Sequence, residues 1–425
     1  MGAVAFLPLI VFLVCYVGCG ITFTLLGADE PFGKFPRHVA LLAGCAVALL
    51  LNRGIGVQDK LNIMTTSMGN SGVMMIVLIY LMAGGFQGAA AAMGGKDSVV
   101  NLCLHFIPVK LLVPGVFLMC CFISTSIGTS MGTIAAMAPI AINVAQGAHL
   151  NVAVVGAAGS YFGDNLSMIS DTTISAAEGC GSEMKDKFKM NFFIALPAAI
   201  VAMILYSIFG GVGSGAIEAG SYSIIEVLPY FIVLIAALMG VNVAVVLFVG
   251  ILASGIIGLC VGSCGFFEWI QAIGSGMSDM FSISIVAILV SGIIGLVREY
   301  GGVEWLVGAI SSKIKSRRGA EYGIGLMSGI LSAAMVNNTI AIIVTCPIAK
   351  GIGEKYKIAP KRLASLVDIF ACAFIALMPH DGGMLMITAL ADVSPLNVLK
   401  YSFYMFGLII ATCVTIQFGL MDKKN

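Results

Sequence analysis

The residues best suited to bind an ion lie between Gly163 and Thr173, a stretch with two carboxylates, one amide and four hydroxyls. Carboxylate, amide and hydroxyl oxygens are hard ligands that can replace the water around a cation such as Na⁺. A polar surface loop is the alternative interpretation, but such a loop normally carries Lys or Arg, and this stretch has neither. We therefore expect it to line a wet cavity or to bind a ligand.

Asp164 and Asp171 are the leading Na⁺ ligands of this stretch. If the stretch is helical, their spacing of seven residues places them on one face about two turns apart. An Asp at the centre of a bilayer costs about 2.5–3.5 kcal/mol, so it is usually paired, protonated or ion-bound. An Asp that exchanges H⁺ for Na⁺ would couple the two gradients directly. The other polar residues expected around the ion are Asn165, Ser167, Ser170, Thr172 and Thr173.

The composition predicts an all-α polytopic membrane protein in contact with membrane lipids. Of the 425 residues, 59% are hydrophobic and 10% are charged, whereas soluble domains average about 25% charged residues. A helix crosses a bilayer with roughly 20 apolar residues, which gives an expected total of about 10–12 transmembrane segments. The net charge of +1 gives no reason to expect a nucleic-acid partner. The first apolar segment is expected to be a span and not a cleaved leader, because no basic residue precedes it.

Between residues 99 and 180 the apolar segments are short and are joined by turns rich in Ser, Thr, Gly and Asn. Such half-length segments are typical of discontinuous helices and re-entrant hairpins, whose free carbonyls attract cations and whose free amides attract anions. The first turn, 124–133, contributes Thr129, Ser130 and Thr133 to the expected site. Single hydroxyls there could instead bond to carbonyls of their own helix. An earlier span, Val73–Met93, is expected to break at Gly84-Gly85.

The second half of the chain repeats the layout of the first. Residues 332–341 lie 208 positions after 124–133, which places Asn337-Asn338 opposite Thr129-Ser130. With eight extra residues in the following loop, Pro379-His380-Asp381 falls opposite Gly163-Asp164-Asn165. Duplicated halves with matching broken helices indicate a site near the bilayer midplane of a secondary transporter. We therefore expect a first repeat in 1–190, with polar turns 124–133 and 163–173, and a second in 191–425, with polar turns 336–339 and 379–383.

The second repeat adds Asn337, Asn338, Thr339, His380 and Asp381 to the expected ion or substrate site. Adjacent Asn residues within an apolar span are costly unless they serve a purpose. Histidine titrates near neutral pH, so His380 with Asp381 could form a proton relay or contact a solute. An interfacial loop is an equally good interpretation of that pair.

The remaining charged residues suggest loops at the membrane surface. By the positive-inside rule, the best cytoplasmic candidates are the basic clusters Lys185–Lys189, Lys313–Arg318 and Lys350–Arg362. Asp368 falls within a predicted span, either near the interface or inside the bundle. The twelve Cys residues are expected to pack and not to bind a metal or form disulfides, because no His or acidic residue accompanies them at ligand spacing.

Two motifs resemble those of the NhaC Na⁺/H⁺ antiporter family. Gly128–Thr133, followed by Pro139-Ile140-Ala141, resembles the family's Gly-Thr-Ser-Trp-Gly-Thr segment, with Met131 in place of Trp. Gly163–Thr173 resembles the family's Gly-Asp-Lys-x-Ser-Pro-x-Ser-Asp-Thr-Thr segment. The resemblance implies two inverted repeats, each with a re-entrant hairpin and a discontinuous helix. It also implies Na⁺ and H⁺ as coupling ions, with no other cofactor.

This chain departs from the second motif at two positions. Met168 stands where Pro is usual, and Asn165 stands where Lys is usual. Loss of the Lys removes a fixed positive charge and leaves room for the charge of a solute. The family also includes amino-acid and carboxylate carriers, so the resemblance leaves the substrate open.

The expected function is secondary active transport that couples Na⁺ and H⁺ gradients by alternating access, in the plasma membrane and most simply the bacterial inner membrane. The alternative is an amino-acid or carboxylate permease with little pure Na⁺/H⁺ exchange. An ion channel is less expected, because the polar residues cluster at turns and do not form continuous stripes. An enzyme is not expected, because neither a phosphate-binding loop nor a nucleophile motif occurs. A homodimer is compatible with the sequence.

Overall fold

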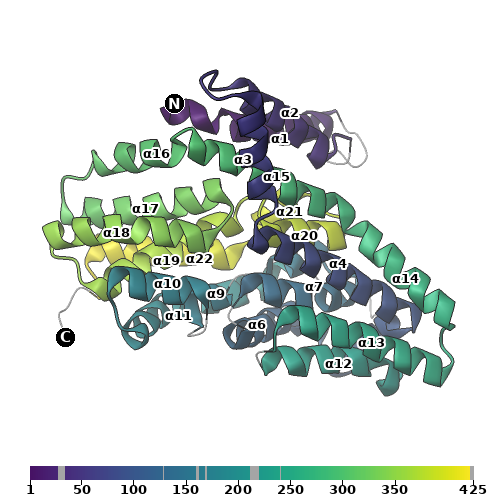
Figure 1. Cartoon of the computed structure of the whole chain (residues 1–425). Helices are drawn as coiled ribbons and strands as arrows, with labels where there is room; N and C mark the ends of the chain where they lie inside the picture. Colours follow the sequence, from purple (N-terminus) through teal and green to yellow (C-terminus); the bar gives the residue numbers. More distant parts are fainter. Residues whose placement is uncertain are drawn as a thin grey trace.

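The computed structural model describes residues 1–26, 34–127, 129–158, 162–167, 170–210, 220–239 and 241–421, and every regular element within these ranges is a helix (Figure 1). Five helical segments of this described part are long and apolar enough to cross a membrane, and six shorter apolar helices accompany them. The five are Gly2–Phe23, Ser71–Ala92, Met184–Phe209, Val243–Val261 and Phe266–Glu299. The prediction of an all-helical protein with several membrane-length helices is confirmed. Gly128, Met168 and Ile169, which belong to the two motifs, lie outside the described residues.

The long segments correspond to η1 (Gly2–Phe6) with α1 (Leu7–Leu25), α4 (Ser71–Ala92), α11 (Met184–Phe209), α13 (Val243–Val261), and α14 (Phe266–Asp279) with α15 (Phe281–Glu299). The other helices of the first half are α2 (Arg37–Leu50), α3 (Val57–Met68), α5 (Gly95–Phe106), α6 (Val109–Ile127), α7 (Ser130–Gly147), α8 (Val152–Ala158), α9 (Phe162–Leu166) and α10 (Asp171–Cys180). Those of the second half are α12 (Ile224–Leu238), α16 (Gly302–Ser311), α17 (Arg317–Met335), α18 (Asn338–Tyr356), α19 (Pro360–Ala376), α20 (Gly382–Ala391), α21 (Pro395–Lys400) and α22 (Phe403–Phe418).

A helix ends and another begins at each of the four polar turns expected from the sequence. The four breaks separate α6 from α7, α9 from α10, α17 from α18, and α19 from α20. Asp164 therefore lies on α9 and Asp171 on α10, so the single helix that would place both on one face does not exist. A stretch of Ser, Thr and Asp favours helix starts over helix interiors, because these side chains bond to free backbone amides.

Helix starts also set the register between the two halves. Ser170 is the residue before α10, and Asp381 is the residue before α20. The element boundaries thus place Asp381 opposite Ser170, whereas the polar residue types alone place it opposite Asn165. The difference arises because Asp164-Asn165 end a helix in the first half and His380-Asp381 precede one in the second.

The broken helices of the two halves pack against each other crosswise. α10 of the first half contacts α18 and α19 of the second, and α20 of the second contacts α7 of the first (Figure 1). Within the first half, α9 crosses α6 so closely that a Cβ on Gly163 would collide with the backbone of Ser124. The amide of Gly163 also donates to Oγ of Ser124 at 2.5 Å. This packing brings breaks that are far apart in sequence to the centre of the molecule.

The expected break at Gly84-Gly85 is wrong, because α4 runs without interruption from Ser71 to Ala92. Gly84 and the nearby Gly88 instead allow two helices to pack closely. A Cβ on Gly84 would collide with the backbone of Gly276 in α14, and a Cβ on Gly88 would collide with the backbone of Ala272. Small residues spaced four apart let two helices approach until their backbones touch, which is how helices associate in lipid.

Candidate functional site

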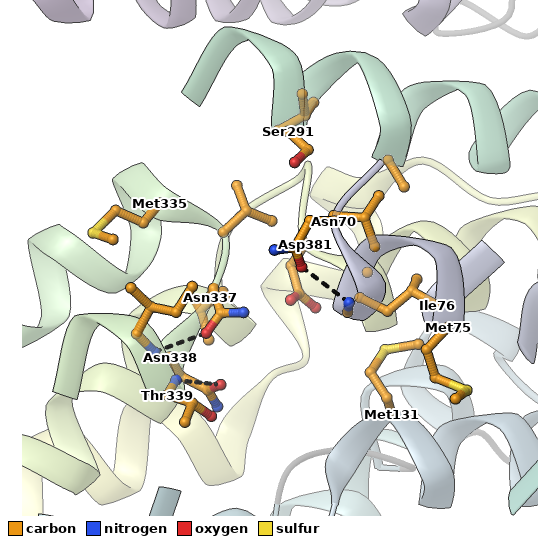
Figure 2. A pocket seen from close by; sticks show the side chains of 18 of the residues that line it. Asn70, Met75, Ile76, Met131, Ser291, Met335, Asn337, Asn338, Thr339 and Asp381 are labelled. Carbon is orange, nitrogen blue, oxygen red and sulfur yellow. Dashed lines mark hydrogen bonds between the residues drawn. The ribbon is translucent and has the colours of Figure 1, made fainter. Parts of the chain in front are cut away.

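All four helix breaks contribute residues to one pocket of about 390 Å³ (Figure 2). The first half supplies Thr129 and Ser130 from one break and Asp171 from the other. The start of α4 and the middle of α15 form further walls of the pocket. Figure 2 shows Asn337, Asn338 and Thr339 on one side of the pocket and Met75, Ile76 and Met131 on the other. The polar residues from the breaks in the lining are Thr129, Ser130, Asp164, Ser170, Asp171, Thr172, Asn337, Asn338, Thr339, His380 and Asp381.

The pocket receives the amino-terminal ends of α7, α10, α18 and α20. Their N-cap residues are Thr129, Ser170, Asn337 and Asp381. Thr129 accepts from the amide of Gly132, Asn337 from that of Ile340, and Asp381 from those of Gly383 and Met384. Part of the polar character seen in the sequence is thus explained by helix capping. The same arrangement directs the positive ends of four helix dipoles into one space.

Asp164 is the carboxylate that joins the two halves at this site. Its side chain is 5% exposed. Oδ1 accepts from the backbone amide of Ser130 at 2.8 Å, and Oδ2 accepts from Nδ2 of Asn338 at 3.2 Å. Its main-chain carbonyl accepts from the hydroxyls of Thr172 and Thr173 across the second break. One residue therefore contacts the starts of α7, α10 and α18.

Asp171 lines the same pocket from the other side of the second break. It is the first residue of α10, and its side chain is exposed. Arg298, from the last turn of α15, is also exposed and lines the pocket. Asp164 and Ser130 are buried, whereas Asp171 and Arg298 are exposed, so a ligand in this pocket can meet charges of both signs.

The structure places four of the expected site residues away from the pocket. Among the described residues that line it, Asn165, Ser167, Thr173 and Thr133 do not appear. Oγ of Ser167 donates to the carbonyl of Thr125, and Oγ1 of Thr133 donates to that of Thr129. These two hydroxyls bond to nearby carbonyls of the first break and stabilise its backbone. Asn165 is fully buried beside the pocket.

His380 and Asp381 both line the pocket and are both buried. Nε2 of His380 lies 3.1 Å from the carbonyl of Ala333, a contact that requires Nε2 to carry the proton. In the described part of the chain, Nδ1 then has no hydrogen-bond partner. The carboxylate of Asp381 caps α20, and the carbonyl of Gly382 accepts from the hydroxyl of Tyr80 at 2.7 Å.

A buried ion pair beside the pocket was missed by sequence reasoning. Nζ of Lys187 lies 2.6 Å from Oδ2 of Asp368, and both side chains are 0% exposed. The expectation that Lys187 belongs to a basic surface loop is wrong, because α11 begins at Met184 and turns this residue inward while Lys185 and Lys189 stay exposed. Asn191, one turn after Lys187, donates to Asp368 at 2.9 Å. Lys187, Asn191 and Ala195 are spaced four residues apart, so they lie on one face of the helix. This spacing is the sequence signal that could have indicated a buried polar face.

No group of three or more His, Cys, Asp or Glu side chains that could hold a metal ion occurs among the described residues. A Na⁺ ion in this pocket would draw its ligands from a carboxylate and from neutral oxygens of hydroxyl, amide and main-chain carbonyl groups. The pocket offers all of these around Asp164, so its donor set fits Na⁺.

Membrane-length helices around a polar pocket built from helix breaks are the arrangement of a secondary transporter. The chain belongs to the Na⁺/H⁺ antiporter (NhaC) family, whose family model, described as "Na+/H+ antiporter family", matches residues 4–211 and 214–423. The resemblance seen in the two motifs is thereby confirmed. The chain is a multi-pass membrane transporter and not an enzyme.

Relatives of this chain include antiporters with different cargoes. A malate-2H(+)/Na(+)-lactate antiporter of Bacillus subtilis is 26% identical over 196 residues, which span 45% of this chain and 42% of that protein. The arginine/ornithine antiporter ArcD of Halobacterium salinarum is 22% identical over 84% of this chain and 80% of that protein. The Na(+)/H(+) antiporter NhaC of Bacillus subtilis is 25% identical over 83% of this chain and 85% of that protein. Among solved structures, the YdaH transporter of Alcanivorax borkumensis covers 87% of this chain and 90% of its own, with a TM-score of 0.40 and 11% sequence identity.

Proposed function

We propose that this chain couples the Na⁺ and H⁺ gradients across the membrane, with Asp164 as the group that takes up either ion. The observation that carries the proposal is the convergence of four helix breaks on one pocket that contains a buried carboxylate. A carboxylate in such a position binds a proton or a cation, because an uncompensated charge there is costly. Exchange of H⁺ for Na⁺ at one group makes the movement of each ion depend on the other.

The residues around Asp164 have different roles in the proposed ion binding. The amide of Ser130 and the side-chain amide of Asn338 orient the carboxylate. Hydroxyl oxygens in the lining, such as those of Thr129 and Thr339, supply neutral ligands once a cation replaces the proton. Asp171, whose side chain is exposed, attracts cations from the aqueous side.

The transport cycle we propose is alternating access by two inverted repeats, 1–190 and 191–425, within about 10–12 transmembrane segments. Each repeat contributes a re-entrant hairpin and a discontinuous helix, with the pocket at their crossing. One part of each repeat moves against a fixed scaffold and exposes the pocket to the two sides in turn. We place the protein in the bacterial inner membrane, where a homodimer is one assembly to test.

Co-transport or exchange of a small amino acid or carboxylate is the second candidate function, and the shape and charge of the pocket favour it. A volume of about 390 Å³ exceeds what one ion needs. Four helix amino termini and Arg298 favour an anionic group, while Asp164 and Asp171 favour a cationic one. The names of two relatives, a malate/lactate antiporter and an arginine/ornithine antiporter, agree with such cargo.

Flux measurements in proteoliposomes test the proposal and separate the two candidates. With Na⁺/H⁺ coupling, an imposed Na⁺ gradient moves protons in the absence of any solute. With solute coupling, proton or Na⁺ movement requires an amino acid or carboxylate, which a thermal-shift screen of the purified protein can identify because ligands stabilise the state they bind. Absence of any proton or solute flux under a Na⁺ gradient, in either direction, would contradict both.

A further inference from the structure

The ammonium group of Lys187 lies in an oxygen cage built at the second helix break. Nζ lies 2.6 Å from Oδ2 of Asp368, 2.5 Å from Oγ1 of Thr173 and 3.3 Å from the main-chain carbonyl of Asn165. An ammonium has three N–H donors, and these three oxygens satisfy all of them. Lys187 itself projects into the cage from α11, a separate helix.

The three oxygens belong to three helices that meet at the break. Asn165 lies in the last turn of α9, Thr173 in the first turn of α10, and Asp368 on α19. The last turn of a helix has free carbonyls and carries negative partial charge, which attracts a cation. A carboxylate, a helix-end carbonyl and a hydroxyl are also the donors that hold Na⁺ at discontinuous helices.

A second hydrogen-bond donor holds the same cage in place. Nδ2 of Asn191 donates both to the carbonyl of Asn165 at 3.0 Å and to Oδ2 of Asp368 at 2.9 Å. Lys187, Asn191 and Asp368 are all completely buried. Asn191 therefore holds two of the three cage oxygens without the lysine, and the cage is dry enough that its carboxylate needs a positive partner.

We propose that the cage of Asn165, Thr173 and Asp368 is a monovalent-cation site that Lys187 fills from within. The ammonium group of Lys187 is covalently attached to the chain, so it holds the helix ends at the second break together without the need for a dissociable ion. It therefore leaves Asp164, the residue next to Asn165, as the exchangeable site. Removal of the lysine side chain should open the cage to a small cation such as NH₄⁺ or Na⁺. This inference concerns the cage alone and does not depend on which solute is carried.

The test is the thermal unfolding of purified Lys187→Ala protein in choline chloride and in ammonium chloride at equal ionic strength. In choline, the unfolding midpoint should fall by about 5–10 °C relative to the parent, because a buried carboxylate loses its partner. Ammonium should restore at least half of this loss, while tetramethylammonium, which is too large for the cage, should restore none. Ammonium should change the midpoint of the parent protein little.

Two further variants keep the result interpretable. Lys60→Ala removes another buried lysine, whose Nζ donates to the carbonyls of Leu49 and Leu51. In the described part of the chain the hydrogen-bond partners of this Nζ include no carboxylate, so ammonium should not reverse the loss of stability in this variant. Lys187→Ala combined with Asp368→Asn removes the anion of the cage and should abolish the ammonium effect. A Lys187→Ala protein that folds only in ammonium supports the proposal. If ammonium stabilises it no more than the parent, or if it is unfolded in both salts, the proposal is wrong.

Discussion

At the scale of single residues, the site depends on a carboxylate that several helix starts share. Asp164 accepts from Ser130 and Asn338, residues that begin α7 and α18, and its carbonyl accepts from two threonines of α10. A change in the charge of this side chain therefore alters hydrogen bonds to helices of both halves of the chain. In the proposed function, Asp164 is therefore the residue through which ion binding affects the arrangement of the helices.

Replacement of Asp164 by Asn should reduce Na⁺-driven flux in proteoliposomes to background, because the amide can neither release a proton nor neutralise a cation. Asp171→Asn should leave flux measurable but raise the Na⁺ concentration for half-maximal rate by about tenfold, or about 1.4 kcal/mol, since this side chain is exposed. Asp279→Asn, an exposed change at the end of α14, is the matched control. Wild-type Na⁺ dependence in both Asp164→Asn and Asp171→Asn would show that the site is misplaced.

Asn338→Ala should weaken Na⁺ binding, measured as Na⁺-dependent thermal stabilisation, by about 10- to 100-fold. A hydrogen bond to a charged group contributes about 1.5–3 kcal/mol. Asn337→Ala is the neighbouring control, because the side chain of Asn337 caps α18. That change should lower stability by about 1 kcal/mol and alter Na⁺ affinity less. Equal losses of affinity in the two variants would argue that Asn338 acts only through the start of α18 and not through its bond to Asp164.

Residue types predicted many of the residues that line the pocket, but not which of them contact each other. The polar turns could be recognised because Asp, Asn and Thr are rare within apolar spans. Asp164 contacts Ser130 and Asn338 in the structure. The contact between Asp164 and the amide of Ser130 depends on how α9 crosses α6 and α7, which no local pattern encodes. Lys187 was missed because three alternating lysines look like a solvated loop, and only the tertiary packing of α11 turns one of them inward.

At the scale of helices, the fold depends on glycines that let backbones touch. The sequence predicts where helices break when polar residues interrupt an apolar run, as at 163–173. Prediction from sequence fails for glycine, because a glycine can either end a helix or allow two helices to pack closely. The local sequence does not distinguish these two roles. Gly84 and Gly88 illustrate the second case, because their role is visible only once α14 lies against α4.

Gly276→Ala should lower the stability of the protein by about 1–3 kcal/mol, since the new methyl group collides with the backbone of Gly84, which cannot rotate away. Gly274→Ala, two residues earlier on the same helix, has open space around it. That change should be neutral or stabilising by up to about 1 kcal/mol. The midpoints of thermal unfolding of the two variants check this directly, and equal midpoints would mean that α4 and α14 do not pack as described.

At the scale of the whole molecule, the two halves exchange contacts at the pocket. α10 of the first half packs on α18 and α19 of the second, and α20 of the second packs on α7 of the first. A shift of one half against the other must therefore rearrange the breaks around Asp164. In the proposed cycle, the occupancy of Asp164 is thereby linked to the arrangement of the bundle, which is the requirement for coupled transport.

The most direct test of this coupling is proton release on Na⁺ addition to the purified protein in weakly buffered detergent solution. The wild-type protein should acidify the medium as Na⁺ displaces the proton from Asp164, and the effect should saturate with Na⁺ and be absent with choline. Asp164→Asn protein, confirmed as folded by its thermal transition, should release no proton. Undiminished proton release from folded Asp164→Asn protein, or none from the wild type, would contradict the assignment of Asp164 as the shared site for Na⁺ and H⁺.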